Sequence, residues 1–354
     1  MPLSNVSVLD LSRFLPGPQC AALLGDYGAK VIRVETPKHA AARDRVFGLD
    51  KLGEADRARC IASDLAGRNK DRKIIDFFTS AGQKDVLKIA SQSDVFIHDF
   101  RINAIEACDL GPDALRAVNP RLIYVAVSAT GMTGPRADAP GHDPIAQALA
   151  GTVSRSGTPP HLLGFPAADT ITAAQAAFAV MVAIRRRDAT GEGAVLDVAM
   201  SDAALSLMTS VFARQQRTGV EPDMDFPMGD NSVFETADGK HVVATNMERP
   251  YWDRFCRAVD RPDLMPLFVG NRPAVLAELA TIYASKTRAE WDAFAKSNDL
   301  QIAPVLSPAE ALDEPHHHDR GVLVRDASGV VLPGRPVRFV DMDAPRPRPA
   351  EDVT

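Results

Sequence analysis

The sequence predicts an α/β protein: a parallel sheet in the first part of the chain and a smaller α+β unit after it. Short β-branched runs alternate with helical segments over the first third, which is the pattern of a parallel sheet. The pattern becomes helical from about residue 170. Residues 219–231 are rich in Pro, Gly and Asp and form the best linker candidate, and an Asp-Gly hairpin signal follows at Asp238-Gly239. Two domains are also expected because 354 residues exceed the usual size of one core.

The first part is expected to begin with a strand and a helix that stops at Gly28, a residue typical of helix ends. The expected strands are Ser7–Leu11, Lys30–Glu35, Lys73–Phe77, Asp94–Asp99 and Leu122–Ser128, and the expected helices are Pro18–Tyr27, 80–92, 112–118, Thr170–Arg187 and Met200–Thr218. The helix over 170–187 begins beside an acidic residue and ends in three arginines, which suits the helix dipole at both ends.

The second part is expected to contain two hairpins and several helices. The expected strands are Ser232–Thr236, His241–Thr245 and the segment QIAPVL, the expected helices are 249–259, 273–285, 287–297 and 307–313, and a second hairpin is expected across Asp326-Ala327-Ser328-Gly329. The proline-rich end, PRPRPAED, is expected to be extended and loosely held.

Composition excludes several classes of function. The net charge of -6 argues against a general nucleic-acid binder, which needs a broad basic face. The four cysteines are far apart in the sequence and form no metal-binding spacing, so we expect reduced thiols. No secretory signal pattern is visible, and the longest apolar stretch, about 171–184, is shorter than a membrane span of roughly 18 residues. We therefore expect a cytoplasmic protein without a membrane partner.

The residues most indicative of chemistry are His142 and Asp169. His142 stands in Gly141-His142-Asp143, in a loop after a strand, where parallel α/β folds bind their ligands. Asp169 stands at the start of the apolar helix, where a simple N-cap is the alternative reading. A histidine and a carboxylate in one pocket can carry a proton in either direction near neutral pH. Glu248 opens a later helix, a position that acids also occupy for structural reasons.

A local excess of basic residues occurs in 37–73, which holds ten Lys and Arg against six acids. Such a short patch, interleaved with acids, is better suited to bind a small polyphosphate than a nucleic-acid duplex. A solvated loop with scattered ion pairs explains the same residues equally well. Three adjacent histidines, His316–His318, do not converge on one ion in a helix or strand, so no metal site is predicted.

Taken together, these segments resemble the family III CoA-transferases and their relatives, the α-methylacyl-CoA racemases. The resemblance runs through nearly the whole chain and is carried by VLDLSRFLPGPQCAALLGDYGAKVIRVETP, DVFIHDFR, GPDALRAVNPRLIYVAVS, GMTGPRADAPGHDPIAQALAG, TGEGAVLDVAMSDAALSLM and IAPVLSPAEALDEPHHHDRG.

The resemblance implies an interlocked homodimer with a Rossmann-like large domain built from both chain ends. The implied organisation is a large CoA-binding domain over 1–200, a linker helix and loop over 201–230, a small domain over 231–315 and a returning segment over 316–354. It also implies an acyl-CoA substrate and no tightly bound cofactor. Arg33 and Arg101 match basic positions near the nucleotide end of CoA, Arg72 belongs to the basic patch that CoA's phosphates would explain, and Asp143 is expected beside the bound CoA.

Two reactions remain open within this resemblance. In the transferases the residue matching Asp169 is a nucleophile that carries the acyl group and then CoA. In the racemases it is an acid/base on one face of the α-carbon, while the residues matching His142 and Glu248 serve the other face. GHD and MERPYW resemble the racemase form, which we take as the first expectation for a 2-methyl-branched acyl-CoA. Thr170-Ile171-Thr172-Ala173 replaces a glycine-rich stretch usual in racemases, so a CoA-binding protein without activity is a third reading.

Overall fold

The computed structural model describes residues 1–46, 48–137, 139–220, 228–269, 272–326, 329–341 and 347–351. The chain divides into two compact units, each described by itself below. The first unit consists of Met1–Ala213 and Pro315–Thr354, and the second of Arg214–Glu314. The two ends of the chain therefore belong to the same unit.

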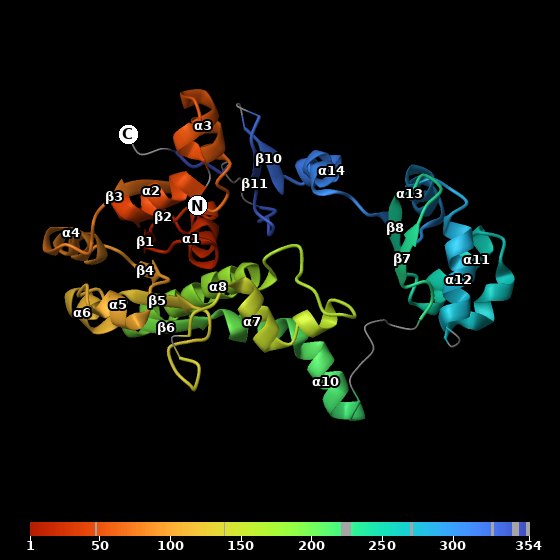
Figure 1. The fold of residues 1–354 in the computed structure, drawn as a ribbon, viewed down its shortest axis with the longest axis horizontal. Helices are drawn as coiled ribbons and strands as arrows, with labels where there is room; N and C mark the ends of the chain where they lie inside the picture. Colours follow the sequence, from red (N-terminus) through yellow and green to blue (C-terminus); the bar gives the residue numbers. More distant parts are fainter. Residues whose placement is uncertain are drawn as a thin grey trace. The chain divides into compact units, whose positions relative to one another are not determined.

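A six-stranded parallel sheet forms the centre of the first unit (Figure 1). Its strands are β1 (Ser7–Asp10), β2 (Lys30–Glu35), β3 (Lys70–Ile74), β4 (Val95–His98), β5 (Ile123–Ser128) and β6 (Ala194–Ala199). Their order is β3-β2-β1-β4-β5-β6, and every neighbouring pair is parallel. This is the doubly wound order, in which the connections reverse direction between β1 and β4 and ligands bind outside the carboxyl ends of the strands. The expected α/β fold class is confirmed.

Helices cover both faces of this sheet (Figure 1). The helices from Met1 to Thr218 are α1 (Pro16–Asp26), α2 (Pro37–Val46), α3 (Glu54–Ala62), α4 (Ser80–Ala90), α5 (Ile102–Glu106), α6 (Pro112–Val118), α7 (Asp143–Ala150), α8 (Ala167–Thr190), α9 (Met200–Leu205) and α10 (Thr209–Thr218). Helices α1 and α8 contribute to the core on one face of the sheet, and α4, α5 and α6 to the core on the other. Alternate strand residues enter two different cores, as the period of two in a strand requires. Ile123 and Val125 pack with α1 and α8, whereas Tyr124 and Ala126 pack with the core that includes α4, α5 and α6.

Most sequence-predicted elements of the first unit are present, but some boundaries and elements differ. Strand β2 and helix α6 have the predicted bounds. Strand β3 begins three residues earlier than expected, at Lys70, and carries charged residues at four of its five positions. The sequence did not predict α2, α3, α5, α7 or β6. Helix α2 buries no side chain, so it has no apolar periodicity from which a helix could be predicted.

Helix α8 is longer than the sequence suggested. It spans 24 residues, and its 18-residue apolar window reaches a mean hydropathy of 1.6, so length and composition alone would permit a membrane crossing. The expectation of an apolar stretch too short for a span is therefore wrong. One face of α8, including Ala173, Ala176 and Val180, is nevertheless buried in the core that it shares with α1 and the sheet. A core helix of this kind passes the same hydropathy test.

The second unit combines a three-stranded antiparallel sheet with helices. Its strands are β7 (Ser232–Glu235), β8 (His241–Ala244) and β9 (Ile302–Pro304), and its helices are α11 (Arg249–Ala258), α12 (Arg272–Tyr283), α13 (Arg288–Asn298) and α14 (Pro308–Asp313), with a 3-10 helix at Pro262–Phe268. Its core contains the fully buried rings of Trp252, Phe255, Tyr283 and Trp291. The predicted Asp-Gly turn joins β7 to β8, with Gly239 at φ 69°. Most of the expected linker, 221–227, lies outside the described residues.

The C-terminal segment adds α15 (Pro315–Asp319) and the antiparallel pair β10 (Leu323–Arg325) and β11 (Val331–Pro333) to the first unit. This pair is the second predicted hairpin, although Ala327 and Ser328 of its turn lie outside the described residues. The expectation of a loosely held end is wrong for 347–351. Arg348 exchanges two backbone-linked hydrogen bonds with Asn69 and pairs with Asp71, and Ala350 is buried beside Leu49.

A buried ion pair ties three elements of the first unit together. Lys70 Nζ lies 2.7 Å from Asp10 Oδ2, and neither side chain is exposed to solvent. Lys70 also donates to the carbonyl of Pro18 (2.7 Å), while the backbone N–H of Ser12 donates to Asp10 Oδ1 (2.9 Å). The pair therefore joins β1, β3 and the first turn of α1.

Replacing Lys70 with Met should destabilise the protein by about 3–5 kcal/mol, because it leaves the Asp10 carboxylate buried without its cation. Urea unfolding followed by circular dichroism measures the change. Lys73→Met, an exposed lysine on the same strand, is the matched control and should be nearly neutral. The combined variant Asp10→Leu/Lys70→Met should recover part of the loss. Equal destabilisation by the Lys70 and Lys73 substitutions would contradict this role of the pair.

Candidate active site

Several of the candidate site residues lie near the carboxyl edge of the parallel sheet. Asp10 ends β1, His98 ends β4 and Ser128 ends β5. The chain after β5 leads to His142 and α7, so His142 and Asp143 lie on connections from the edge where α/β sheets bind their ligands. The topological switch between β1 and β4 lies on the same edge.

The carboxylate of Asp143 joins the beginnings of α7 and α8. Its Oδ1 accepts hydrogen bonds from the backbone N–H groups of Ala168 (2.7 Å) and Asp169 (3.1 Å), and its Oδ2 accepts one from Gln147 Nε2. The N-cap residue of α8 is Pro166, which supplies no side-chain cap, so Asp143 satisfies two of the free N–H groups of this helix. The buried Asp143 thereby fixes the start of α8 against the start of α7.

Asp169 is the third residue of α8, and the N-cap reading considered from the sequence is wrong. Its carboxyl group is half-buried. Burial and, after it, the charge of Asp143 raise the pKa of Asp169 to about 6, and His142 acts in the opposite direction. A carboxyl group with this pKa exchanges a proton readily near neutral pH, as a general acid or base requires.

His142 is the N-cap residue of α7, and its imidazole makes no capping hydrogen bond. The side chain is exposed, and it contacts the ring of Phe14 edge-to-face with the centroids 5.2 Å apart. Its effect on the pKa of Asp169 indicates that the structure brings these two sequence-predicted residues into electrostatic contact. His142, Asp143 and Asp169 therefore form one cluster.

Small side chains allow the helices that carry this cluster to approach closely. Ala146 and Ala150 of α7, Ala168 of α8 and Ala204 of α9 form a buried cluster together with Ala129 and Met200. Gly141 belongs to the same packing, since a Cβ atom there would lie 3.0 Å from Ala129 Cβ and 3.2 Å from Ile145 Cγ2. A larger residue at position 141 would displace the loop that carries His142.

Glu248 belongs to the second unit, where it is the exposed N-cap residue of α11. Its carbonyl accepts the N–H groups of Tyr251 and Trp252 (both 3.0 Å). The side-chain amide of Gln301, with its nitrogen turned toward Glu248, donates to Glu248 Oε2 at 3.2 Å. These bonds hold the glutamate on a rigid helix start and leave its carboxylate exposed.

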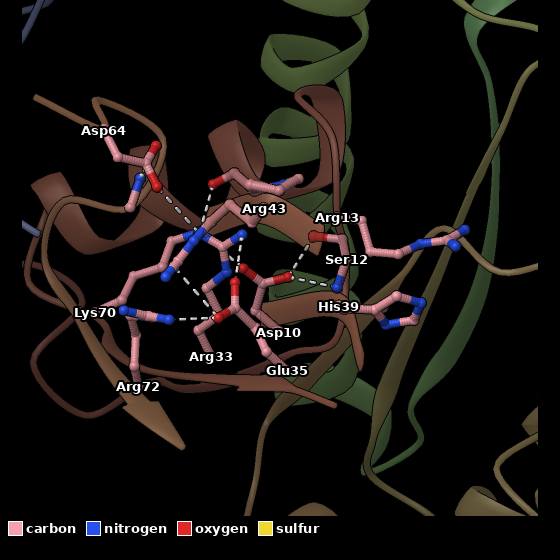
Figure 2. A network of polar contacts seen from close by, with 12 residues as sticks. Asp10, Ser12, Arg13, Arg33, Glu35, His39, Arg43, Asp64, Lys70 and Arg72 are labelled. Atoms are coloured by element: carbon pink, nitrogen blue, oxygen red, sulfur yellow. Dashed lines mark hydrogen bonds and ion pairs between the residues drawn. The ribbon is translucent and has the colours of Figure 1, made fainter. Parts of the chain in front are cut away.

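Arg33 and Arg72, expected near CoA, lie in an ion-pair network at the end of β2 (Figure 2). Arg33 pairs with Glu35 at 3.0 Å and with Asp64 at 3.4 Å, and Arg72 pairs with Glu35 at 2.5 Å. Arg43 contacts the same glutamate. Burial raises the pKa of Glu35, but these three arginines outweigh burial and hold it below its ordinary value. Both expected residues are thus engaged by carboxylates of this chain.

Arg101 differs from these two, because its side chain is exposed. It is the N-cap residue of α5 and follows Phe100 in the loop after β4. The loops after β1 and β4 at the switch point also carry Arg13, Phe14 and Asp99, none of which the sequence predicted as a site residue. Arg13 Nε donates to Asp99 Oδ1 at 2.9 Å, and the Arg13 guanidinium lies over the Phe100 ring at 4.2 Å.

Within the described ranges, no three His, Cys, Asp or Glu side chains are placed to hold a metal ion. His316, His317 and His318 fall in the short helix α15. A cavity of about 610 Å³ lies between the C-terminal end of α1 and the C-terminal segment, lined by Tyr27, Arg335 and Phe339 among others. None of the candidate site residues lines this cavity.

Comparison with known proteins decides the family. A model of the family described as CoA-transferase family III matches residues 3–352. The chain belongs to CoA-transferase family III. The family III chain is 30% identical to a succinyl-CoA:mesaconate CoA-transferase from Haloarcula hispanica over 372 residues, which covers 96% of this chain and 90% of that protein.

Two further comparisons bear on reaction and fold. Human alpha-methylacyl-CoA racemase is 28% identical over 345 residues, covering 94% of this chain and 85% of that protein. A solved structure of a CaiB/BaiF family protein from Brucella suis superposes with a TM-score of 0.85 at 23% identity, covering 100% of this chain and 96% of that chain. The last likeness concerns the fold alone. The names of both relatives refer to CoA thioesters, but they describe different reactions.

The Asp143 charge should control the protonation of Asp169. Replacing Asp143 with Asn removes a repelling charge, so the pKa of Asp169 should fall below its present value of about 6 and remain above its ordinary value because burial persists. Carbon-13 NMR titration of the aspartate carboxyl groups, with Asp169→Asn for assignment, measures the shift. Asp188→Asn, at the far end of α8, is the control. An unchanged or higher pKa in Asp143→Asn would contradict the repulsion.

Proposed function

We propose that this protein is a racemase that inverts the α-carbon of a 2-methyl-branched acyl-CoA thioester by 1,1-proton transfer. The observation that carries the proposal is the raised pKa of the Asp169 carboxyl group beside His142. Inversion needs two groups that exchange protons on opposite faces of one carbon, and a pKa near the working pH suits both the removal and the return of a proton.

The reaction is a removal of the α-proton followed by its return on the other face. The thioester carbonyl acidifies the α-proton, and its removal gives an enolate that requires electrostatic stabilisation. Asp169 is assigned to one face and His142 to the other. In one direction Asp169 takes the proton and His142 supplies one, and in the other direction the roles are exchanged.

Glu248 is assigned to orient or charge-couple His142 from a second copy of the chain, in an interlocked homodimer. An exposed apolar stripe on α8 supports such a partner. Phe178 is 71% exposed, Val182 53% and Met181 38%, and their spacing puts them on one side of the helix. An apolar stripe of this kind on a helix of the first unit is typical of a surface that another chain covers.

For the CoA moiety, Arg101 is the first candidate to bind phosphate, because its guanidinium is exposed at the carboxyl edge of the sheet. Arg33 and Arg72 are assigned a supporting role: their pairs with Glu35 shape the end of β2 on which the nucleotide end would lie. We assign Asp143 a place beside CoA, and its hydrogen bonds fix the starts of α7 and α8 there. No tightly bound cofactor is required by this chemistry.

CoA transfer between carboxylic acids is the second candidate, favoured by the name of the Haloarcula hispanica relative at 30% identity. Here an Asp169 oxygen attacks the thioester carbonyl, the thiolate of CoA leaves, and a mixed anhydride forms. The CoA thiolate then attacks the Asp169 carbonyl and releases the first acid, and the second acid repeats these steps in reverse.

Wild-type protein incubated with an (R)-2-methylacyl-CoA in D₂O should incorporate one α-deuterium and produce the (S) form, because the returned proton comes from groups that exchange with solvent. Mass spectrometry and chiral chromatography measure both. Absence of exchange over a panel of branched acyl-CoAs would overturn the racemase proposal. In that case, a hydroxylamine-trapped derivative of Asp169 after incubation with succinyl-CoA or another acyl-CoA would establish the transferase.

Replacing His142 with Ala separates the two reactions. A racemase should lose about 10²–10⁴-fold in activity, since a positioned acid/base group contributes that much. A transferase that uses Asp169 as nucleophile should keep much of its activity. His241→Ala, an exposed histidine on β8, is the control and should behave as the wild type in either case.

Coexpression tests whether the partner supplies Glu248. Homodimers of His142→Ala and of Glu248→Ala should each be inactive. A mixed dimer pairs the intact His142 of one chain with the intact Glu248 of the other and restores one complete site. Activity in the coexpressed sample well above either parent is the expected result. No gain, with mixed dimers demonstrated by mass, would show that both residues act from the same chain.

A further inference from the structure

The imidazole of His142 is held chiefly by a contact with one phenyl ring. Phe14 lies in the loop between β1 and α1, and its ring meets the His142 ring edge-to-face, with centroids 5.2 Å apart and planes at 82°. His142 does not cap α7, and among the described residues no hydrogen bond fixes its side chain. Beside the electrostatic contact of His142 with Asp169, the ring contact is therefore the interaction that orients the imidazole.

Phe14 is itself fixed, although 65% of its surface is exposed. The Arg13 guanidinium carbon lies 5.1 Å from the Phe14 ring centroid and 4.2 Å from that of Phe100. In such cation–π contacts the guanidinium is attracted electrostatically to the face of the ring, which holds the exposed ring in place. The phenyl group thus lies against a cation and an imidazole rather than free in solvent.

Arg13 is anchored in turn by Asp99. The Arg13 backbone N–H and Nε donate to the two carboxylate oxygens of Asp99, at 2.8 and 2.9 Å, and a terminal guanidinium nitrogen donates to the Asp99 carbonyl at 3.1 Å. The Asp99 side chain is only 9% exposed. This three-bond contact joins the loops after β1 and β4 and connects the rigid centre of the sheet to the Phe14 ring.

We propose that Phe14 is a positioning residue for His142, held in place by the Arg13–Asp99 pair. The inference rests on the proposed function, in which His142 exchanges a proton with the α-carbon. A chain of contacts runs from Asp99 through Arg13 and Phe14 to His142, and each step is a direct contact in the structure. Its role is to hold the imidazole in the orientation that reaches the substrate.

The geometry also predicts how a loss of this contact should appear in kinetics. Proton transfer requires the nitrogen at hydrogen-bond reach of the carbon-bound proton, whereas binding of CoA depends on other residues. A misplaced catalytic group costs up to roughly 10²-fold in rate when the error is about 1 Å. The effect of removing Phe14 should therefore fall on kcat far more than on KM.

The experiment compares Phe14→Ala, Phe14→Tyr and the control Phe339→Ala. Phe339 is also exposed (48%), and its ring makes the same kind of edge-to-face contact with Tyr27, at 6.1 Å. Tyr27 follows the C-terminal end of α1 and Phe14 precedes its start, so the two contacts are separated by the helix, about 16 Å at 1.5 Å per residue.

Two measurements are made on each variant. The first is the exchange of α-deuterium, with kcat and KM separated. The second uses no substrate: diethyl pyrocarbonate modifies histidines, and peptide mass spectrometry gives the rate at His142, with the other seven histidines as internal references. The second measurement reports on the surroundings of His142 whatever reaction the protein performs.

We expect Phe14→Ala to lower kcat on the order of 10-fold with little change in KM and to accelerate modification of His142 alone. Phe14→Tyr should restore both values, and Phe339→Ala should change neither. An unchanged modification rate at His142 in Phe14→Ala overturns the inference even if the wild type exchanges deuterium. If the wild type exchanges no deuterium but Phe14→Ala still accelerates modification of His142, the racemase reaction is rejected and the contact between Phe14 and His142 is supported.

Discussion

The Asp143 carboxylate, which receives hydrogen bonds from the first turn of α8, is the interaction on which the candidate site depends. Two backbone N–H groups of α8 point at one of its oxygens, and Gln147 holds the other. A free helix N-terminus carries a positive potential that favours a negative charge. Because Asp143 begins α7 and directly follows His142, this one contact sets the distance and the angle between the helix starts that carry His142 and Asp169.

The same contact perturbs the acid that it positions. A buried carboxylate beside Asp169 opposes ionisation of the second carboxyl group, and burial acts in the same direction. The proton affinity of Asp169 therefore depends on the packing of two helices. The buried cluster of small side chains that includes Ala146, Ala168 and Ala204 lets α7, α8 and α9 pack closely enough for the two carboxyl groups to interact. Bulkier residues there would separate the two carboxyl groups and weaken their coupling.

The central strands β4 and β5 could be predicted from the sequence because they are buried on both faces and are therefore runs of β-branched and aromatic residues, whereas the edge strands β3 and β6 are partly exposed and were misplaced or missed. Helices such as α2 lack an apolar face and left no signal. Within the site, His142 and Asp169 could be recognised as chemically suited residues and as a family pattern. The hold of Asp143 on α8 could not, because it joins residues 25 and 26 positions apart through a fold that local sequence does not specify.

Arg33 and Phe14 also show what local sequence does not specify. Arg33 was predicted to bind CoA and is engaged by carboxylates, whereas Phe14 was not predicted and contacts His142. Arg33 is a basic residue in a patch suited to phosphate, yet Glu35 and Asp64 occupy its guanidinium, and only the fold brings Asp64 to it. Phe14 is a phenylalanine in a loop with no motif, yet the reversal of the sheet between β1 and β4 puts it between Arg13 and His142.

The raised pKa of Asp169 also has a consequence for stability. Its folded-state pKa of about 6 lies above the ordinary value of 3.8, so the folded state binds the proton more tightly than the unfolded state. Stability from this group is present below the ordinary value and is lost as pH rises through about 6. At neutral pH the ionised Asp169 thus opposes folding. A group arranged only for stability would be paired or exposed, whereas a proton-transfer group requires this compromise between stability and activity.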